Sequence, residues 1–232
     1  MKLIALIFVC IVGVTGCTSP SSDSTNTTSH SQADKTVPGI YTESDGLLLM
    51  DAEHTETTDL DLWERVLPGD SRYLAGSTND EHLEFTGNNI GSGDPNAPLV
   101  YTFRISKGGT YQLFIRARKR LEGARKDLCN DCYVKIAGDF TSGNPKAALS
   151  ALLTDTKLYG GDADGWGWAG SLDSEEADHT PAKYIFKAGE TYTLTISGRS
   201  QRFNIDRIVL FHSDITRDWD HFINSPESQR VQ

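Results

Sequence analysis

The sequence predicts an all-β protein whose strands form a β-sandwich or jelly roll. Many short segments alternate apolar and polar residues and are bounded by glycine, asparagine, aspartate or proline, which is the pattern of half-buried strands. One turn-and-strand unit occurs twice, and no helical stripe of comparable length accompanies either copy. Short strands without intervening helices pack as two facing sheets, so we expect any helices to decorate a sandwich.

The repeated unit gives the clearest strands. Its first copy, 107–118, begins with Lys-Gly-Gly and continues with apolar residues at alternate positions: Tyr111, Leu113, Ile115 and Ala117. The second copy, 187–199, begins with Lys-Ala-Gly and has a matching register: Tyr192, Leu194, Ile196 and Gly198. A period of two places each set on one face of its strand, so we expect the copies to be corresponding strands of the sandwich.

Further elements complete one domain. Six other segments have the composition of strands: 46–51, 82–85, 99–105, 133–136, 182–186 and 204–211. The best helix candidates are short, at 145–155 and 216–223. We expect a single sandwich domain over 37–213, which fits the usual ~100 to 200 residues of a domain, and a C-terminal tail over 214–232.

The N-terminus has the order of a secretory signal peptide. Residues 1–16 carry one positive charge, at Lys2, and an apolar run shorter than the ~20 residues of a membrane-spanning helix. The tetrapeptide that ends at Cys17 resembles a bacterial lipobox, which implies that Cys17 is acylated. Ordinary secretion with an incidental Cys17 is the alternative. We expect a lipid-anchored protein of the cell envelope, and Thr18 favours the outer membrane because it does not supply an inner-membrane retention signal.

The segment that follows, 17–36, is rich in serine and threonine and has no large apolar residue. Such a segment cannot bury enough surface to offset the entropy of ordering, so we expect a disordered tether. The chain is also acidic, with a formal charge of −10 that becomes −11 without Lys2. This charge argues against a nucleic-acid partner, because phosphate binding needs a basic surface.

The cysteines left after export form one closely spaced pair. Cys10 leaves with the signal and Cys17 is the acylation site, so Cys129 and Cys132 remain. In an oxidising compartment a local disulfide is the expected use of such a pair. Half of a zinc site is the alternative, but the sequence offers no second Cys-x-x-Cys and no His-x-x-x-His to complete it.

The first and last strands carry a resemblance to a known family. The first reads Leu-Leu-Met-Asp-Ala-Glu over 48–53 and the last reads Asn-Ile-Asp-Arg-Ile-Val-Leu over 204–210. With the paired Gly-x-Tyr-x-Leu strands, this order resembles the carbohydrate-binding modules of families 6, 35 and 36. The resemblance implies a galactose-binding-like sandwich that binds polysaccharide or oligosaccharide through loops at one edge, without catalysis.

The same resemblance implies a structural calcium ion. Its ligands would be Glu53 and Asp206, with Asp51 as a weaker third candidate. Calcium prefers several carboxylate and carbonyl oxygens, and a sandwich can bring its first and last strands side by side. The alternative is that these acids lie at strand ends in solvent.

Two tryptophans are candidate sugar platforms. Trp166 and Trp168 lie in a glycine-rich segment, 160–173, where small neighbours cannot bury both of them and the backbone can approach a ligand closely. If the segment is extended, alternation places both indoles on one face. A pair of core tryptophans is the alternative.

Polar candidates follow from a basic run and from the end of the second repeat. Basic residues concentrate over 116–126 in an otherwise acidic protein, and arginine forks suit a carboxylated or sulfated polysaccharide. The resemblance favours Asn130 as a sugar contact, and we add Arg118, Asp131 and Arg199. The alternative for most of these charges is a solvated loop, and Arg199 could pair with an acid instead.

The leading hypothesis is therefore a non-catalytic, membrane-anchored lipoprotein that binds polysaccharide. A polysaccharide lyase or glycoside hydrolase on a jelly roll is one alternative, although the histidines are scattered and none forms a local motif with a nucleophile. A protein-interaction or structural lipoprotein is the other, since sandwich folds serve many functions.

Overall fold

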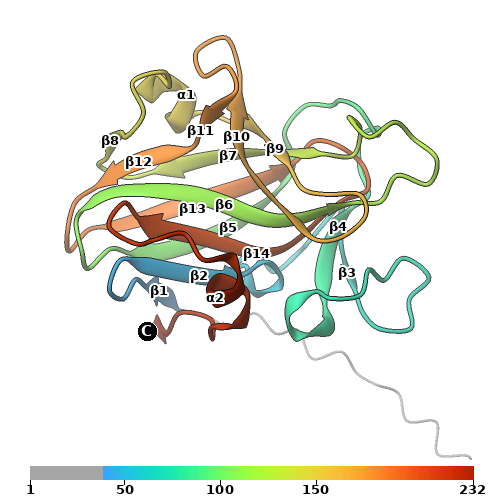
Figure 1. Ribbon diagram of the computed structural model, residues 1–232, viewed down its shortest axis with the longest axis horizontal. Helices are drawn as coiled ribbons and strands as arrows, with labels where there is room; N and C mark the ends of the chain where they lie inside the picture. The colour runs from blue at the N-terminus through green and yellow to red at the C-terminus, as the bar shows by residue number, and fades with distance from the viewer. Residues whose placement is uncertain (1–38) are drawn as a thin grey trace, which may run out of the picture. The chain divides into compact units, whose positions relative to one another are not determined.

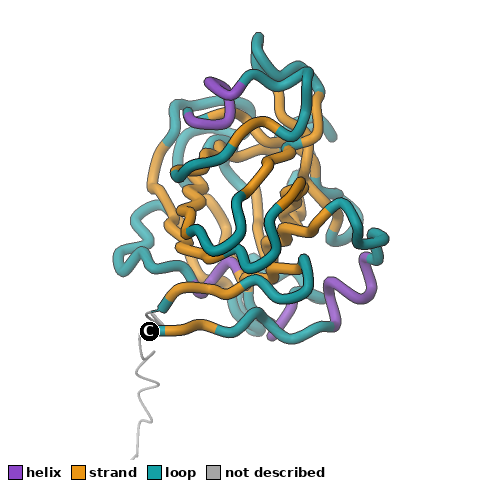
Figure 2. The backbone as a smooth tube through the Cα atoms, turned by 90° about the vertical axis from the view of Figure 1, so that its left-hand side faces the viewer, coloured by secondary structure: helices purple, strands orange, loops and turns teal. Residues whose placement is uncertain are grey.

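The computed structural model describes residues 39–232, which fall within one compact unit of the chain. Two layers of strands face each other across an apolar interior (Figure 1). The helices lie at the periphery of the strands, as the purple segments of Figure 2 show. The predicted all-β sandwich is confirmed, and its few helices decorate it.

The elements are short, as the sequence indicates. The longer strands are β5 (Asn96–Arg104), β6 (Gly109–Lys119), β7 (Asp131–Ala137), β10 (Gly167–Asp173), β13 (Thr191–Gly198) and β14 (Phe203–His212). The shorter strands are β1 (Ile40–Thr42), β2 (Leu47–Asp51), β3 (Trp63–Val66), β4 (His82–Phe85), β8 (Thr141–Ser142), β9 (Thr156–Gly160), β11 (Thr180–Pro181), β12 (Lys183–Phe186) and β15 (Arg230–Val231). The helices are η1 (Ala52–His54), η2 (Thr78–Asp80), α1 (Leu149–Leu153) and α2 (Trp219–Asn224).

The strands are hydrogen-bonded along one curled path. Its order is β15-β1-β5-β13-β7-β9-β10-β6-β14-β4-β3, while β2 pairs with β14 and β12 pairs with β6. The path curls over at β9 and β10, so β5, β13 and β7 lie behind β6, β14 and β2 in Figure 1. We call these the back sheet and the front sheet.

Alternation of side chains explains the interior. On β13, Tyr192, Leu194 and Ile196 are buried, while the intervening Thr193 and Thr195 are half-exposed. The apolar set of β6 is buried in the same core cluster as that of β13. The two copies of the repeated unit therefore supply one central strand to each sheet, as predicted.

The predicted secondary structure agrees with the structure in most segments. Each of the six further strand candidates contains or overlaps one of β2, β4, β5, β7, β12 and β14. The helix candidate 145–155 contains α1, and the candidate 216–223 overlaps α2. Seven strands over 39–232 were not predicted: β1, β3, β8, β11 and β15, which have two to four residues, β9, which has five, and β10, which has seven. The short segments show too few alternations to be recognised, and glycine and alanine obscure the alternation of β10.

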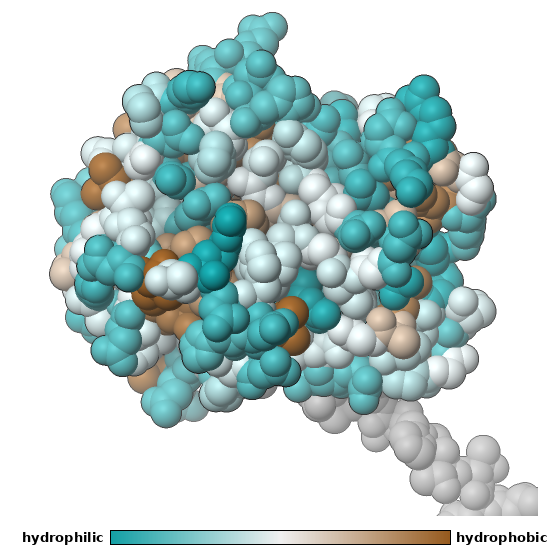
Figure 3. Space-filling model, in the orientation of Figure 1, coloured by the Kyte–Doolittle hydropathy of each residue, from teal (hydrophilic) through white to brown (hydrophobic). Residues whose placement is uncertain are grey.

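The last residues belong to the fold, which corrects the predicted tail over 214–232. Helix α2 packs Phe222 into a second apolar cluster on the outer side of the front sheet, and β15 pairs antiparallel with β1. Apolar side chains also reach the surface on this side of the molecule, at the left of Figure 3. The folded domain therefore continues to the end of the chain.

The predicted signal peptide, Cys17 and the tether lie outside the described residues. Over 39–232, no helix has the length and apolar character needed to span a membrane.

Candidate functional site

A groove runs over the outer face of the back sheet. It has a volume of about 530 Å³ and lies over β7 and β9, between α1 and the segment that follows β10. Its polar lining comes from alternation, because Cys132, Val134 and Ile136 of β7 point into the core. The residues between them, Tyr133 and Lys135, are half-exposed on the outer face.

Strand register aligns four side chains in a row, and three of them, Tyr133, Lys157 and Asp173, line the groove. Tyr133 pairs with Ser197 on one side and with Lys157 on the other, and Lys157 pairs with Asp173. Residues directly opposite each other on neighbouring strands have Cβ atoms ~4.5 to 5.5 Å apart. The row therefore forms a continuous polar strip across β13, β7, β9 and β10, although its members are far apart in sequence.

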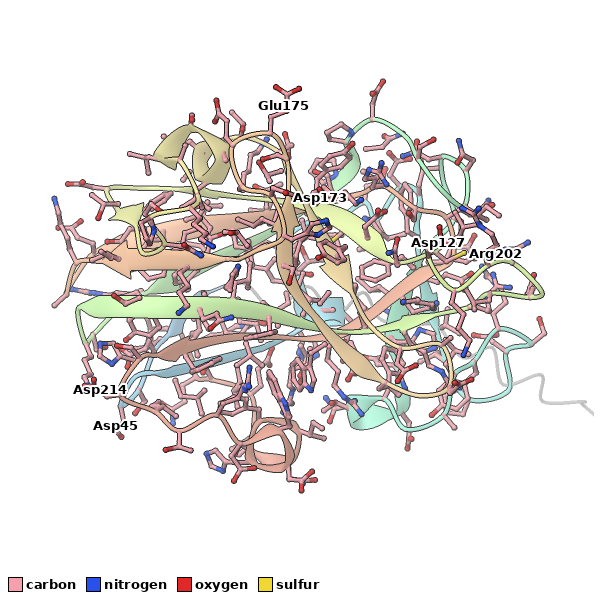
Figure 4. The ribbon with its side chains drawn as sticks, turned by 45° about the horizontal axis from the view of Figure 1, so that its top comes forward. Asp45, Asp127, Asp173, Glu175, Arg202 and Asp214 are labelled. Carbon is pink, nitrogen blue, oxygen red and sulfur yellow. The ribbon has the colours of Figure 1, made fainter. Side chains whose placement is uncertain are left out.

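Ion pairs hold this strip together. The Lys157 ammonium lies 2.7 Å from an Asp173 oxygen and 3.5 Å from Asp131, and Lys135 lies 2.8 Å from Asp155. The bond from Lys157 holds the pKa of Asp173 below its usual range. Asp173 is therefore a carboxylate that accepts hydrogen bonds, which is the opposite of what a general acid needs. Asp173 and Glu175 both line the groove, and Figure 4 labels both side chains.

Arg199 lines the groove and binds the buried Asp131, and both residues are candidates from the sequence. Asp131 is buried and accepts from Arg199 Nη1 at 2.6 Å and from the Ser200 hydroxyl. The Arg199 guanidinium also lies 5.8 Å from the centre of the Tyr133 ring and donates to its hydroxyl at 3.2 Å. The Tyr133 hydroxyl in turn donates to the Gly93 carbonyl at 2.9 Å, so the aromatic ring is fixed in orientation.

Asn130 and Arg118 have other positions. The Asn130 carbonyl accepts from the Gly160 amide at 3.0 Å, which joins the loop before β7 to the end of β9. Arg118 pairs in β6 with Asn204 of β14, and its guanidinium approaches the Ala75 carbonyl at 3.4 Å. Neither side chain is among those that line the groove.

Trp166 supports a loop. Its indole N–H donates to the carbonyls of Leu74 and Ala75, at 3.3 and 3.1 Å, and the Arg116 guanidinium lies 5.4 Å from its ring. Its ring is also edge-on to His82, whose pKa burial lowers to about 4. Trp166 is half-buried and fastens the loop over 74–76 to the front sheet.

Trp168 is a half-buried member of the second apolar cluster. Its ring stacks on Trp219 of α2, with centroids 4.4 Å apart and planes 18° apart, and is edge-on to Phe114. The two predicted platforms therefore lie apart from Asp131 and Arg199. The sequence analysis missed Tyr133, Lys157 and Asp173 as members of one site, because only the pairing of β7, β9 and β10 brings them together.

The basic run over 116–126 is largely neutralised. Arg116 is buried and paired with Asp206, Arg120 binds both oxygens of the buried Glu84, and Arg125 pairs with Asp127 at 2.7 Å. Arg202 lies next to this run and pairs with Glu122 at 3.1 Å. Figure 4 shows Asp127 and Arg202 close together at one end of the domain. These charges do not form an open anion-binding surface.

Glu53 has the environment expected of a cation ligand. Its side chain is buried, and neither carboxylate oxygen has a hydrogen-bond partner among the described residues. Burial raises the pKa of Glu53 well above its usual range, and the carboxylates of Asp51, Glu81 and Asp206 raise it further. Oxygen or nitrogen atoms of Glu53, His54 and Glu81 lie within 4.8 Å of one another. A buried carboxylate without a partner needs a proton or a cation, so the environment of Glu53 fits calcium. Glu81 lies beside it and is itself paired with Arg65 at 3.2 Å.

The other two predicted calcium ligands already have partners. Asp206 accepts from Arg116 and from the amide and hydroxyl of Thr78, at 2.8 and 3.1 Å. Asp51 is paired with the buried Arg207 at 2.7 Å. The charge of Asp206 acts on Glu53 and would favour a cation there, although its oxygens already have partners. The charge of Asp51 is compensated by Arg207.

The predicted disulfide between Cys129 and Cys132 is not formed in the structure. Both thiols are free and buried, and burial raises the pKa of both. Cys132 is the second residue of β7 and packs in the core between the sheets. Cys129 has a left-handed backbone, with φ of 53°, and its amide bonds the Ile90 carbonyl, so it faces a different environment outside this core cluster.

The fold and the groove define a class of protein: an all-β sandwich with a charged, hydrogen-bonding groove on one outer sheet face. No protein-family model matches the chain, and no curated protein matches it. Solved structures are similar to it. A β-(1,4)-mannanase of Podospora anserina, described as GH26-CBM35, is 16% identical, with a TM-score of 0.44 over 76% of this chain and 29% of that chain.

Two further solved structures are similar to the chain. The C-terminal CBM6 of LamC, from Zobellia galactanivorans, is 14% identical, with a TM-score of 0.38 over 71% of this chain and 98% of that chain. The Cry4Aa toxin of Bacillus thuringiensis is 11% identical, with a TM-score of 0.43 over 74% of this chain and 24% of that chain. The chain spans less than a third of the mannanase and of the toxin. This likeness concerns the fold, and the ligand must be argued from the groove.

Proposed function

We propose that this protein binds saccharide chains, without catalysis, in the groove over β7 and β9. The observation that carries the proposal is the strip of Tyr133, Lys157 and Asp173, which combines a fixed aromatic ring with alternating hydrogen-bond donors and acceptors. A sugar presents hydroxyl groups around its ring and C–H groups on its faces. A strip with both kinds of partner is complementary to that surface.

The charge state of the groove favours binding over hydrolysis. A glycoside hydrolase needs a carboxylic acid whose pKa is raised so that it can donate a proton. The pKa of Asp173 is lowered by Lys157, so this residue remains an acceptor at neutral pH. Fixed donors and acceptors bind hydroxyl groups without chemical change.

We further propose that the domain is exported, acylated at Cys17 and held at the outer membrane, and that calcium binds beside Glu53. The first part is supported by the order of charged, apolar and small residues over 1–17. The second is supported by the buried carboxylate of Glu53, which has no hydrogen-bond partner. In this arrangement the anchor would keep the domain near its cell, while the groove takes polysaccharide.

Affinity gel electrophoresis of residues 34–232, the whole compact unit, tests the function. A panel of soluble polysaccharides is cast into the gels, and reducing ends are assayed in the same samples. We expect at least one polymer to retard the protein without release of reducing ends. Lys157→Met and Asp173→Asn should each weaken that retention by about 10- to 100-fold, because a hydrogen bond to a charged group contributes about 1.5 to 3 kcal/mol.

Lys187→Met is the matched control, since Lys187 is an exposed lysine paired with Asp139 outside the groove. It should leave retention unchanged. Trp166→Ala tests the other candidate binding site, at the tryptophan that the sequence suggested. Loss of retention in Trp166→Ala, with full retention in Lys157→Met, would move the binding site to the front sheet. Accumulating reducing ends would make the protein an enzyme.

A further inference from the structure

The charges around the groove restrict the kind of saccharide that it can hold. The lining contains four carboxylates, of Asp155, Asp173, Glu175 and Glu176, against the two cations of Lys157 and Arg199. A fifth carboxylate, that of the buried Asp131, contacts both of these cations. Lys135 lies next to Asp155 and compensates one of these charges. The groove therefore remains negative, within a protein that is itself acidic.

The cations of the groove are already bound to carboxylates. Arg199 is held by Asp131 at 2.6 Å, and Lys157 lies between Asp173 and Asp131. A uronate or sulfate group would have to displace one of these carboxylates and then remain close to the others. Like charges that face each other across an interface lower affinity, so such a chain is disfavoured.

The same pairs suit an uncharged ring. An ammonium group has three N–H donors, and the hydrogen bond to Asp173 uses one of those on Lys157, so N–H donors remain for a ligand even with Asp131 at 3.5 Å. The neighbouring Asp173 carboxylate accepts from hydroxyl groups. The donor and the acceptor are 2.7 Å apart, so two adjacent hydroxyls of a sugar, which are themselves within hydrogen-bond distance of each other, can bind one to each.

We infer that the groove selects uncharged saccharide segments, binds a pair of adjacent hydroxyls between Lys157 and Asp173, and rejects uronate and sulfate chains. This inference rests on the proposed function. It departs from the expectation that the basic run over 116–126 would face an anionic polymer. In the structure Arg116, Arg120 and Arg125 of that run pair with acids of the domain, and Arg118 approaches a backbone carbonyl.

Matched polymers that differ in charge test the inference with residues 34–232. Hydroxyethylcellulose is compared with carboxymethylcellulose, and highly methyl-esterified homogalacturonan with polygalacturonate, by affinity electrophoresis and by calorimetry. We expect the uncharged member of at least one pair to bind at least about tenfold more tightly than its carboxylated partner. Binding of the uncharged chain should change by less than about twofold between about 50 and 500 mM salt, because no ion pair forms with the ligand.

Removal of the rim charges gives a second, independent readout. Glu175→Gln combined with Glu176→Gln should reduce the preference for the uncharged chain by at least about threefold. Asp45→Asn, which removes an exposed carboxylate at the opposite end of the domain (Figure 4), should leave the preference unchanged. The double variant alters only exposed side chains, so folding is not at risk.

The outcomes separate the two proposals. Carboxylated chains that bind as tightly as their uncharged partners, or binding that weakens steeply with salt, would overturn the selectivity and leave saccharide binding in place. An unchanged preference in the Glu175 and Glu176 double variant would overturn the role of the rim charges. Absence of binding to every polymer of either charge would overturn the proposed function, and the selectivity with it.

Discussion

Arg207 and Asp51 form a buried ion pair between the first and last strands of the front sheet. Both side chains are 2% exposed, and one Asp51 oxygen accepts from Nε of Arg207 at 2.8 Å and lies 2.7 Å from its Nη2. The remaining guanidinium nitrogen, Nη1, donates to carbonyls of Phe222, Ile223 and Ser225. One side chain therefore joins the front sheet to the C-terminal segment.

Arg207→Met should lower the free energy of unfolding by about 3 to 5 kcal/mol, because it leaves the Asp51 charge buried without its partner. The combined Arg207→Met and Asp51→Asn variant should recover part of this loss. Urea unfolding measures the stability of the single and the combined variant. Arg125→Met is the control, because the Arg125–Asp127 pair is exposed and contributes about 1 kcal/mol or less. A loss below about 1 kcal/mol in Arg207→Met would show that the pair is not buried as described.

Only some residues of the candidate site could be predicted from the sequence. Asp131 and Arg199 were selected from the sequence, and the structure joins them at 2.6 Å. Tyr133 and Lys157 were not selected, because a single tyrosine or lysine on an alternating strand looks like any solvent-facing residue. Their significance depends on the register between β7 and β9, and long-range pairing cannot be read from one sequence.

At the scale of elements, the longer strands were predictable because their alternation is strong. The pattern of β6 and β13 encodes both the strand and the face that is buried. The C-terminal segment differs, since α2 has six residues and buries one large side chain, Phe222, while β15 has two residues. A segment with so few apolar residues has the composition of an unstructured tail. It folds because Phe222 packs against the apolar outer face of β14, which the composition of the segment itself does not reveal.

Phe222→Ala tests whether this segment is an integral element. Phe222 is fully buried, with its ring 5.3 Å from Phe211 and 5.8 Å from Trp219. We expect a loss of about 3 to 5 kcal/mol in the free energy of unfolding, from lost apolar burial and from the cavity that remains. Leu153→Ala, at an exposed leucine of α1, should change stability by about 0.5 kcal/mol or less. Equal effects of the two substitutions would mean that α2 does not stabilise the sandwich.

At the scale of the molecule over 39–232, the buried carboxylate of Glu53 has no hydrogen-bond partner on either oxygen. Without a cation, its raised pKa means that the folded state holds this proton more tightly than the unfolded state. Its contribution to stability is then present at low pH and is lost as pH rises above the ordinary glutamate range. Asp206, whose pKa burial raises to about 6, acts in the same direction between about pH 4 and 6, while His82, lowered to about 4, opposes them between about 4 and 6.5.

Calcium should compensate the carboxylate of Glu53, which gives a test by metal removal at pH 7.5. A cation that binds only the folded state stabilises it by about 2.7 kcal/mol at a hundredfold excess over Kd. For a domain of this size, that corresponds to a rise in Tm of about 5 to 10 °C over the value in chelator. Glu53→Gln should abolish the calcium response and, in chelator, should melt above the wild type, because the amide has no charge to leave uncompensated. An equal Tm with chelator and with calcium in the wild type would exclude the cation, and the carboxyl of Glu53 would then have to be protonated in the folded protein.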